Sequence, residues 1–125
     1  MKLNQVIKCD SLDDALASLS EHKGQAAIIA GGTEIVPAIY KEQLAASVLV
    51  DIGDIKELRV LKQEGDNVII GAACTHQEVI DSPLTASLDA LRDSLSSVGC
   101  TQTRNLGTIA GNIAMAVPSA DSAVA

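Results

Sequence analysis

The chain has 125 residues, the length of one ordinary domain, and its apolar residues are almost all Ala, Val, Leu or Ile, so its core must be built from many small side chains. It carries 16 acidic residues against 9 basic ones and no basic cluster, so we do not expect nucleic acid as a partner. No segment is apolar enough for a signal peptide or a membrane span, which predicts a cytoplasmic protein with no membrane partner.

Residues 1–53 are predicted to form a small N-terminal lobe. Continuous apolar runs predict buried strands, and apolar residues at helical spacing predict the helices between them. The predicted elements are strands at residues 2–7, 26–30 and 47–52, a helix capped by Ser11 and ended at Gly24, and a helix at residues 34–43. Strand, helix and strand at this spacing predict a parallel βαβ unit.

Residues 54–125 are predicted to form a second lobe with a mixed, partly antiparallel α+β arrangement. Its predicted elements are two strands at residues 59–63 and 67–73 joined by a longer turn at 64–66, a short helix capped by Thr75, and a helix from 88 to 98 ended by Gly99. Asp121 and the small residues after it are typical of a helix start. The chain stops there, which predicts a second lobe truncated at its C-terminus.

The cysteines and histidines do not predict a metal site. Cys9, Cys74 and Cys100 are widely spaced, lack a CxxC pair, and are interpreted as reduced, buried thiols. They cannot provide the four thiolates of an iron–sulfur cluster. His22 fits a helix end and His76 follows the predicted Thr75 cap, so both are given structural roles. No catalytic residue is predicted.

The first candidate binding motif lies between a predicted strand and a predicted helix, and consists of Ala30, Gly31, Gly32, Thr33 and Glu34. Adjacent glycines allow positive φ angles and a close approach of backbone amides to an anion such as a pyrophosphate. Thr33 could donate a hydroxyl to the phosphate or cap the helix. The alternative interpretation is a simple tight turn.

The second candidate motif follows about seventy residues later and is rich in Gly, Thr and Asn. It contains Thr108, Ile109, Ala110, Gly111 and Asn112, preceded by Gln102, Arg104, Asn105 and Gly107 and followed by Pro118 and Asp121. Such a segment could form a second backbone cradle for phosphate. The alternative is a polar connecting loop with Arg104 in a surface ion pair.

Together the two motifs resemble those of the FAD-binding subunit or domain of the molybdenum hydroxylase family. That family, which includes xanthine dehydrogenase and the medium subunit of aerobic carbon monoxide dehydrogenase, carries an AGGTD-type loop and a later QxRNxxTIGGN segment. The intervening segments VDIGDIKEL and VIIGAACTHQEV are similar too, so the resemblance covers the whole chain. It implies a two-lobed α+β FAD-binding fold.

The resemblance also implies the roles of the motif residues. The glycine-loop amides and Thr33 would hold the pyrophosphate of a non-covalent FAD, while Asn112 and Asp121 would bind pyrophosphate and ribityl groups. In the family, the flavin takes electrons from a [2Fe–2S] cluster fed by a molybdopterin centre, both expected here on partner chains, and passes them to NAD or another acceptor.

Two residues depart from the family pattern. Glu34 replaces the usual Asp, and Ala110 replaces the first Gly of a pair, which would strain a second cradle if the position needs a positive φ. Two other functions therefore remain open. One is a structural or assembly module of such a complex without bound flavin, and the other is an unrelated nucleotide-phosphate-binding domain.

Overall fold

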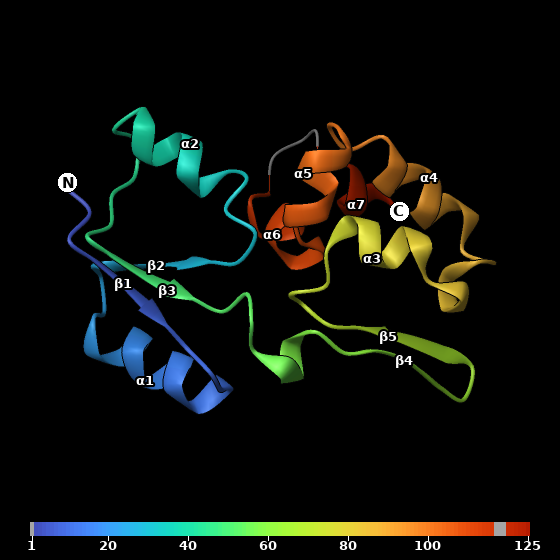
Figure 1. The fold of residues 1–125 in the computed structure, drawn as a ribbon, viewed down its shortest axis with the longest axis horizontal. Coiled ribbons are helices and arrows are strands. Elements are labelled where there is room, and N and C mark those ends of the chain that lie inside the picture. Colours follow the sequence, from blue (N-terminus) through green and yellow to red (C-terminus); the bar gives the residue numbers. More distant parts are fainter. Residues whose placement is uncertain (1, 117–119) are drawn as a thin grey trace.

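The computed structural model describes residues 2–116 and 120–125, and Pro118 of the second motif lies outside them. Its secondary structure confirms the predicted α+β class with a parallel lobe followed by a mixed one (Figure 1). None of the helices among the described residues is long and apolar enough to span a membrane.

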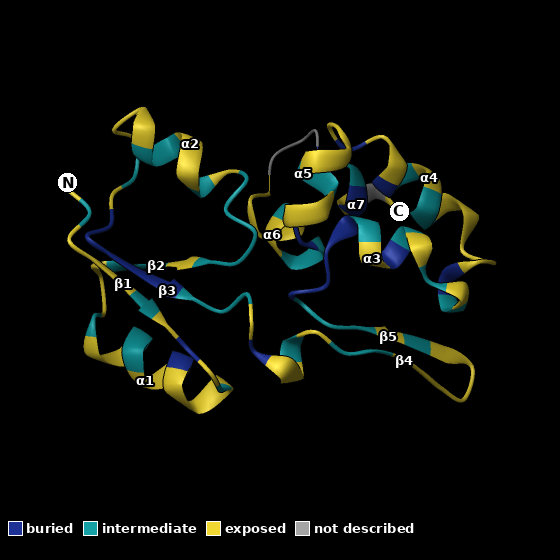
Figure 2. Ribbon diagram, in the orientation of Figure 1, coloured by how far each residue is buried: buried dark blue, intermediate teal, exposed yellow. Residues whose placement is uncertain are grey.

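The N-terminal lobe is built on a three-stranded parallel sheet in the order β1-β3-β2. Its strands are β1 (Gln5–Lys8), β2 (Ala26–Ile29) and β3 (Val48–Asp51), and the connections contain α1 (Leu12–Glu21) and α2 (Ile35–Tyr40). The central strand β3 is the most buried, as Figure 2 shows. The predicted parallel βαβ unit is therefore confirmed, with β1 as a third strand.

Helix α1 begins where the sequence predicts. The hydroxyl of Ser11 accepts a hydrogen bond from the Asp14 amide at 3.1 Å, which satisfies one of the free donors of the first turn. Ala15 on the inner face of α1 packs with Cys9, Val50 and Ile55 into the core of this lobe. Small side chains let the helix lie close to the sheet, as the composition suggests.

The second lobe opens with a short 3₁₀ turn at Lys56–Leu58 and the antiparallel hairpin of β4 (Leu61–Glu64) and β5 (Asn67–Ile70). The predicted longer turn is wrong, because Glu64 already pairs with Asn67 and only Gly65 and Asp66 lie between the strands. Gly65 makes this tight connection possible with a φ of 60°.

The rest of the second lobe is helical and lies on one side of the hairpin (Figure 1). It contains α3 (His76–Asp81), a 3₁₀ turn at Pro83–Thr85, α4 (Asp89–Ser96), α5 (Thr101–Leu106), α6 (Ile109–Ala114) and α7 (Asp121–Val124). Cys74, Val79 and Leu95 form its core. The predicted helix start at Asp121 is confirmed.

Both sequence-based interpretations of residues 102–112 are wrong about the backbone. This segment forms α5 and the start of α6, neither a backbone cradle nor a connecting loop. Gly, Thr and Asn are poor helix formers, but packing of α5 on α3 and the Thr108 cap on α6 outweigh their low propensity. Gly107 separates the two helices.

The cysteines are all free, and Cys9 and Cys74 are buried as predicted. Burial raises the pKa of the Cys74 thiol, so it stays protonated. Cys100 contradicts the prediction because it is exposed, in the short connection between α4 and α5. The described residues contain no group of three or more potential metal ligands.

Candidate functional site

Two helices of the second lobe begin next to each other, each with a threonine cap. Thr75 Oγ1 accepts a hydrogen bond from the Glu78 amide at 3.2 Å, and a Glu78 carboxylate oxygen accepts one from the Thr75 amide at 2.7 Å. Thr108 Oγ1 accepts one from the Gly111 amide at 3.1 Å. Thr75 and Thr108 pair in an antiparallel bridge, so the starts of α3 and α6 are held side by side.

This bridge places His76 against the second motif. The His76 amide donates to the carbonyl of Gly107 at 3.0 Å. A Cβ at Gly107 would lie only 3.1 Å from His76 Cδ2, so the imidazole packs closely against the glycine backbone. His76 is only 2% exposed. The ring is thus held in place before any ligand binds.

The first motif packs directly on the end of α5. A Cβ at Gly31 would lie 1.8 Å from the carbonyl oxygen of Leu106, so no side chain fits there. Gly32 has a φ of 74°, in the region that favours glycine. The two glycines therefore have different tasks, since Gly31 allows contact between the lobes and Gly32 allows the turn. From the sequence, both glycines were expected to let backbone amides approach a ligand.

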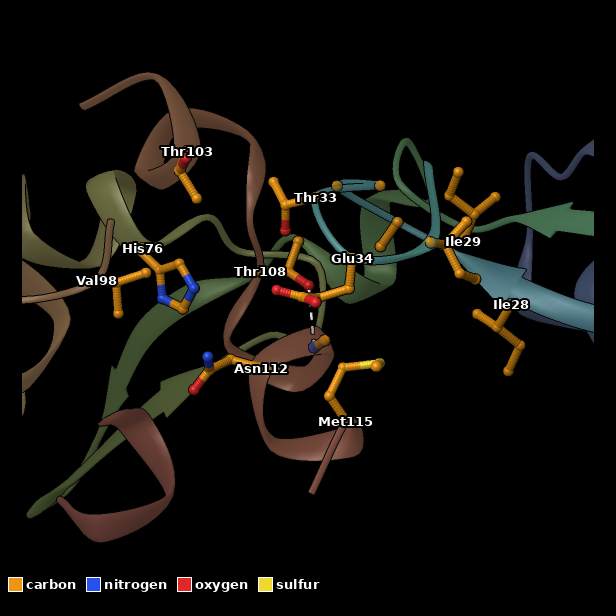
Figure 3. A pocket seen from close by; sticks show the side chains of 15 residues that line it. Ile28, Ile29, Thr33, Glu34, His76, Val98, Thr103, Thr108, Asn112 and Met115 are labelled. Carbon is orange, nitrogen blue, oxygen red and sulfur yellow. Dashed lines mark hydrogen bonds between the residues drawn. The ribbon is translucent and has the colours of Figure 1, made fainter. Parts of the chain in front are cut away.

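A cavity of about 110 Å³ lies between the two motifs (Figure 3). It is lined by eight of the ten predicted site residues, namely Ala30, Gly31, Gly32, Thr33, Glu34, Thr108, Gly111 and Asn112. The sequence did not predict the rest of the lining, which is Ile28, Ile29, Ile35, His76, Val98, Thr103 and Met115. Ala110 and Asp121 do not line it.

The glycine loop, which lines this cavity, contains hydrogen-bond donors that the described part of the chain does not use. Among the described residues, the amides of Gly31, Gly32 and Thr33 have no protein acceptor. Thr33 does not cap α2, because Glu34 occupies the N-cap position and makes no side-chain cap bond. The capping interpretation of Thr33 is therefore wrong, and its hydroxyl is available to a ligand.

Asn112 offers an amide group from the other wall. Its Oδ1 accepts from the Ser122 amide at 3.2 Å and from the Ser122 hydroxyl at 2.5 Å. The two N–H donors of the side chain are thereby turned toward the cavity and His76 (Figure 3). Asp121 lies next to Ser122 at the start of α7 and does not line the cavity.

Ala110 does not disturb the site. It lies in the first turn of α6 and has no positive φ, so the strain expected from the sequence is absent. Alanine is the better helix former at such a position, by about 1 kcal/mol relative to glycine. The departure from the family's glycine pair is therefore compatible with a working second motif.

Substitutions at Ala110 and Gly111, which are adjacent in α6, should separate effects on stability from effects on FAD binding. We expect Ala110→Gly to lower the free energy of unfolding by about 0.5–1 kcal/mol and to leave FAD affinity unchanged. Gly111→Ala should lower both, because its Cβ would lie 2.8 Å from Thr108 Oγ1 and displace the capping hydroxyl. Thermal unfolding and FAD titration of both variants measure this. Equal loss of affinity in both would contradict it.

From the sequence, a purely structural role was expected for His76 and a surface ion pair was one alternative for Arg104, and the structure places both side chains in other surroundings. Arg104 forms no ion pair within the described residues, because it donates to the carbonyls of Ser96 at 3.2 Å and Val98 at 3.0 Å. Burial, and then the Arg104 guanidinium, hold the pKa of His76 below its usual value. A histidine directly after a capping threonine was the only sequence signal for its position, and it does not indicate burial.

The fold occurs in solved structures of carbon monoxide dehydrogenase. One solved structure is carbon monoxide dehydrogenase from Hydrogenophaga pseudoflava, in a form that lacks the Mo-pyranopterin moiety of the molybdenum cofactor. A chain of that enzyme superposes with a TM-score of 0.86 at 31% identity, over 91% of this chain and 40% of that one. The shared fold thus places the chain in the molybdenum hydroxylase class.

Residues 2–125 match the FAD-binding domain in molybdopterin dehydrogenase, and the chain belongs to this family. The carbon monoxide dehydrogenase medium chain of Hydrogenophaga pseudoflava is 35% identical over 112 residues, 89% of this chain and 39% of that relative. The xanthine dehydrogenase FAD-binding subunit of Escherichia coli O157:H7 is 35% identical over 115 residues, 90% of this chain and 39% of that relative. The chain thus spans about two fifths of their length.

The residues of the cavity fit part of an FAD molecule. Free amides, the hydroxyls of Thr33 and Thr108 and the Asn112 amide are neutral donors suited to phosphate oxygens, while Glu34 is a carboxylate suited to hydroxyl groups. The volume of about 110 Å³ is well below that of a site enclosing a whole drug-sized ligand. The cavity is therefore suited to the phosphates of FAD, while its adenine and isoalloxazine rings would have to bind outside it.

Proposed function

We propose that this chain forms the phosphate-binding part of an FAD-binding, electron-transferring subunit of a molybdenum-hydroxylase-type dehydrogenase. The observation that carries the proposal is that two motifs far apart in the sequence line one cavity with unused neutral donors. Bound FAD supplies the redox chemistry, accepting and releasing electrons. The residues of this chain hold and orient its phosphates.

The assignment of individual residues follows from the lining. The loop from Ala30 to Glu34 would hold the pyrophosphate with its amides and the Thr33 hydroxyl, and Asn112 would donate from the opposite wall. Thr108 and Gly111 would shape that wall through the cap of α6. Ala110 and Asp121 would support it from behind, Asp121 through its neighbour Ser122. We also propose residues 1–53 and 54–125 as the two lobes.

The partners belong to the same proposal. A [2Fe–2S] chain and a molybdopterin chain would feed electrons to the FAD, and NAD or another acceptor would receive them. The support is family membership, together with a described chain that holds no cluster of potential metal ligands. A cytoplasmic location remains a prediction from the sequence.

The test is the identity of any molecule that copurifies with the complete natural protein. The visible absorption bands of oxidised flavin, with FAD released on denaturation, are the expected result. A folded protein that assembles with partner chains without flavin would indicate an assembly module. Bound ADP or ATP without flavin would indicate an unrelated nucleotide-binding domain. Either of these results would overturn the proposal.

A further inference from the structure

The cavity has no permanent positive charge. Glu34 and His76 are the only titratable side chains among the described residues that line it. The Glu34 side chain points into the cavity beside Thr108 (Figure 3). Glu34 is exposed to solvent, and a dianionic pyrophosphate would add further negative charge beside it.

Arg104 lies close enough to His76 to lower its pKa, but its guanidinium is used elsewhere. It donates to the carbonyls of Ser96 and Val98 and to the side chains of Gln77 and Thr101. It is absent from the cavity lining. Arg104 therefore stabilises the connection between α4 and α5 and does not provide a contact to phosphate.

His76 is the one lining side chain that can become positive. Its ring is buried, and Nδ1 is the only buried side-chain nitrogen or oxygen without a hydrogen-bond partner in the part of the chain that the structure describes. An unsatisfied buried group of this kind carries a cost of about 1–3 kcal/mol, so it calls for an explanation. The ring lies between Thr103, Thr108 and Asn112 in Figure 3.

We propose that His76 supplies the positive charge of the cavity by taking up a proton from solvent when FAD binds, so that FAD affinity rises as the pH falls. The proposal rests on the proposed function, because it takes the pyrophosphate of FAD as the anion. It assigns His76 to the binding site of this chain as a charge-switching group.

The charged groups around His76 determine the direction of the effect. Without ligand, burial and the Arg104 guanidinium on α5 lower the pKa of His76, and Asp121 on α7 partly opposes them. On its own helix, Glu78 is paired with Arg59. Helix α6 brings no charged residue. Glu34 and the ligand phosphates are the negative groups that face the ring across the cavity.

The ligand therefore raises the pKa of His76. Affinity should be constant above the pKa of the bound form, should rise as the pH falls through it, and should level off below the pKa of the free form. A pKa higher by one unit in the complex corresponds to a tenfold gain in affinity. The pyrophosphate of FAD has only strongly acidic hydroxyls, which stay ionised in this range, so it does not mimic the effect.

The experiment measures the FAD dissociation constant of the flavin-depleted complete natural protein by flavin fluorescence from about pH 7.5 to about pH 5.5. We expect a gain in affinity of about tenfold toward low pH. His76→Gln, which keeps a donor of similar reach without a titratable ring, should bind with a flat profile. His22→Asn, at the end of α1, is the matched control and should keep the wild-type profile.

A second measurement needs no variant. Proton NMR titration should show the pKa of His76 rising on FAD addition. A flat wild-type profile, a His76→Gln profile that still rises, or an unchanged His76 pKa would each overturn the inference while leaving FAD binding intact. Absence of FAD binding at every pH would overturn the proposed function and this inference with it.

Discussion

Gly32→Val in the complete natural protein should weaken FAD binding by about two orders of magnitude or more. Gly32 has a φ of 74°, which a β-branched residue does not adopt without strain, and its added side chain would meet Val36 and Ile29. The loop would have to turn differently, and its amides would lose the positions from which we propose that they bind the pyrophosphate. Each hydrogen bond to a charged group contributes about 1.5–3 kcal/mol, so losing two gives this reduction.

The control for Gly32 is Gly24→Val, after the end of α1. Gly24 has a φ of 80° and no atom within 4 Å of an added Cβ, so its substitution brings a similar backbone strain away from the cavity. We expect both variants to lower the thermal midpoint and only Gly32→Val to lower FAD affinity specifically. If folded Gly32→Val binds FAD like the wild type, the first motif is only a turn.

Gly31→Ala should damage the fold itself. The new methyl group would overlap the carbonyl of Leu106 at 1.8 Å, and a backbone group cannot move aside as a flexible side chain can. We expect a loss of at least about 3 kcal/mol in the free energy of unfolding, which corresponds to roughly 10 °C in thermal midpoint for a domain of this size. Calorimetry of the purified variant measures it.

Gly65→Ala is the comparison for Gly31. Gly65 has a φ of 60° in the hairpin turn, and an added methyl group there would meet open space. Its substitution should cost only the backbone strain, about 1–2 kcal/mol. Equal destabilisation by the two substitutions would show that the contact between the glycine loop and α5 is not tightly packed.

The strands and most helices follow from local patterns. The apolar runs that became β2 and β3 and the caps at Ser11 and Thr75 were all recognisable in the sequence. Each depends on residues within a few positions of one another, where periodicity and capping chemistry act. The sequence predicted these features for that reason.

The helical form of the second motif depends on contacts that no local pattern shows. Helices α5 and α6 contain Thr, Asn and Gly, which are poor helix formers. Helix α5 packs against α3, and the bridge between Thr75 and Thr108 fixes the start of α6. The same bridge brings His76 to the cavity. A residue whose position depends on a partner far along the chain cannot be placed from spacing alone.

The two motifs predicted where the candidate site lies. They predicted the roles of its individual residues less well. Gly31 and Gly32 look alike in sequence, yet the first is constrained by Leu106 and the second by its own φ. Ala110 looked like a defect and lies in an ordinary helical turn. In each case the distinction comes from the local backbone or a neighbour in space, which a single sequence does not reveal.

The bonds from Ser122 to Asn112 have an entropic consequence. An asparagine amide that is free to rotate loses conformational freedom when a ligand binds, at a cost of about 0.5–1.5 kcal/mol for an immobilised side chain. Here α7 already holds the Oδ1 of Asn112 with two donors, so the orientation of the amide is chosen during folding. The start of α7 thereby preorganises the opposite wall of the cavity, and removing the hydroxyl by Ser122→Ala would return part of that entropy cost to the binding step.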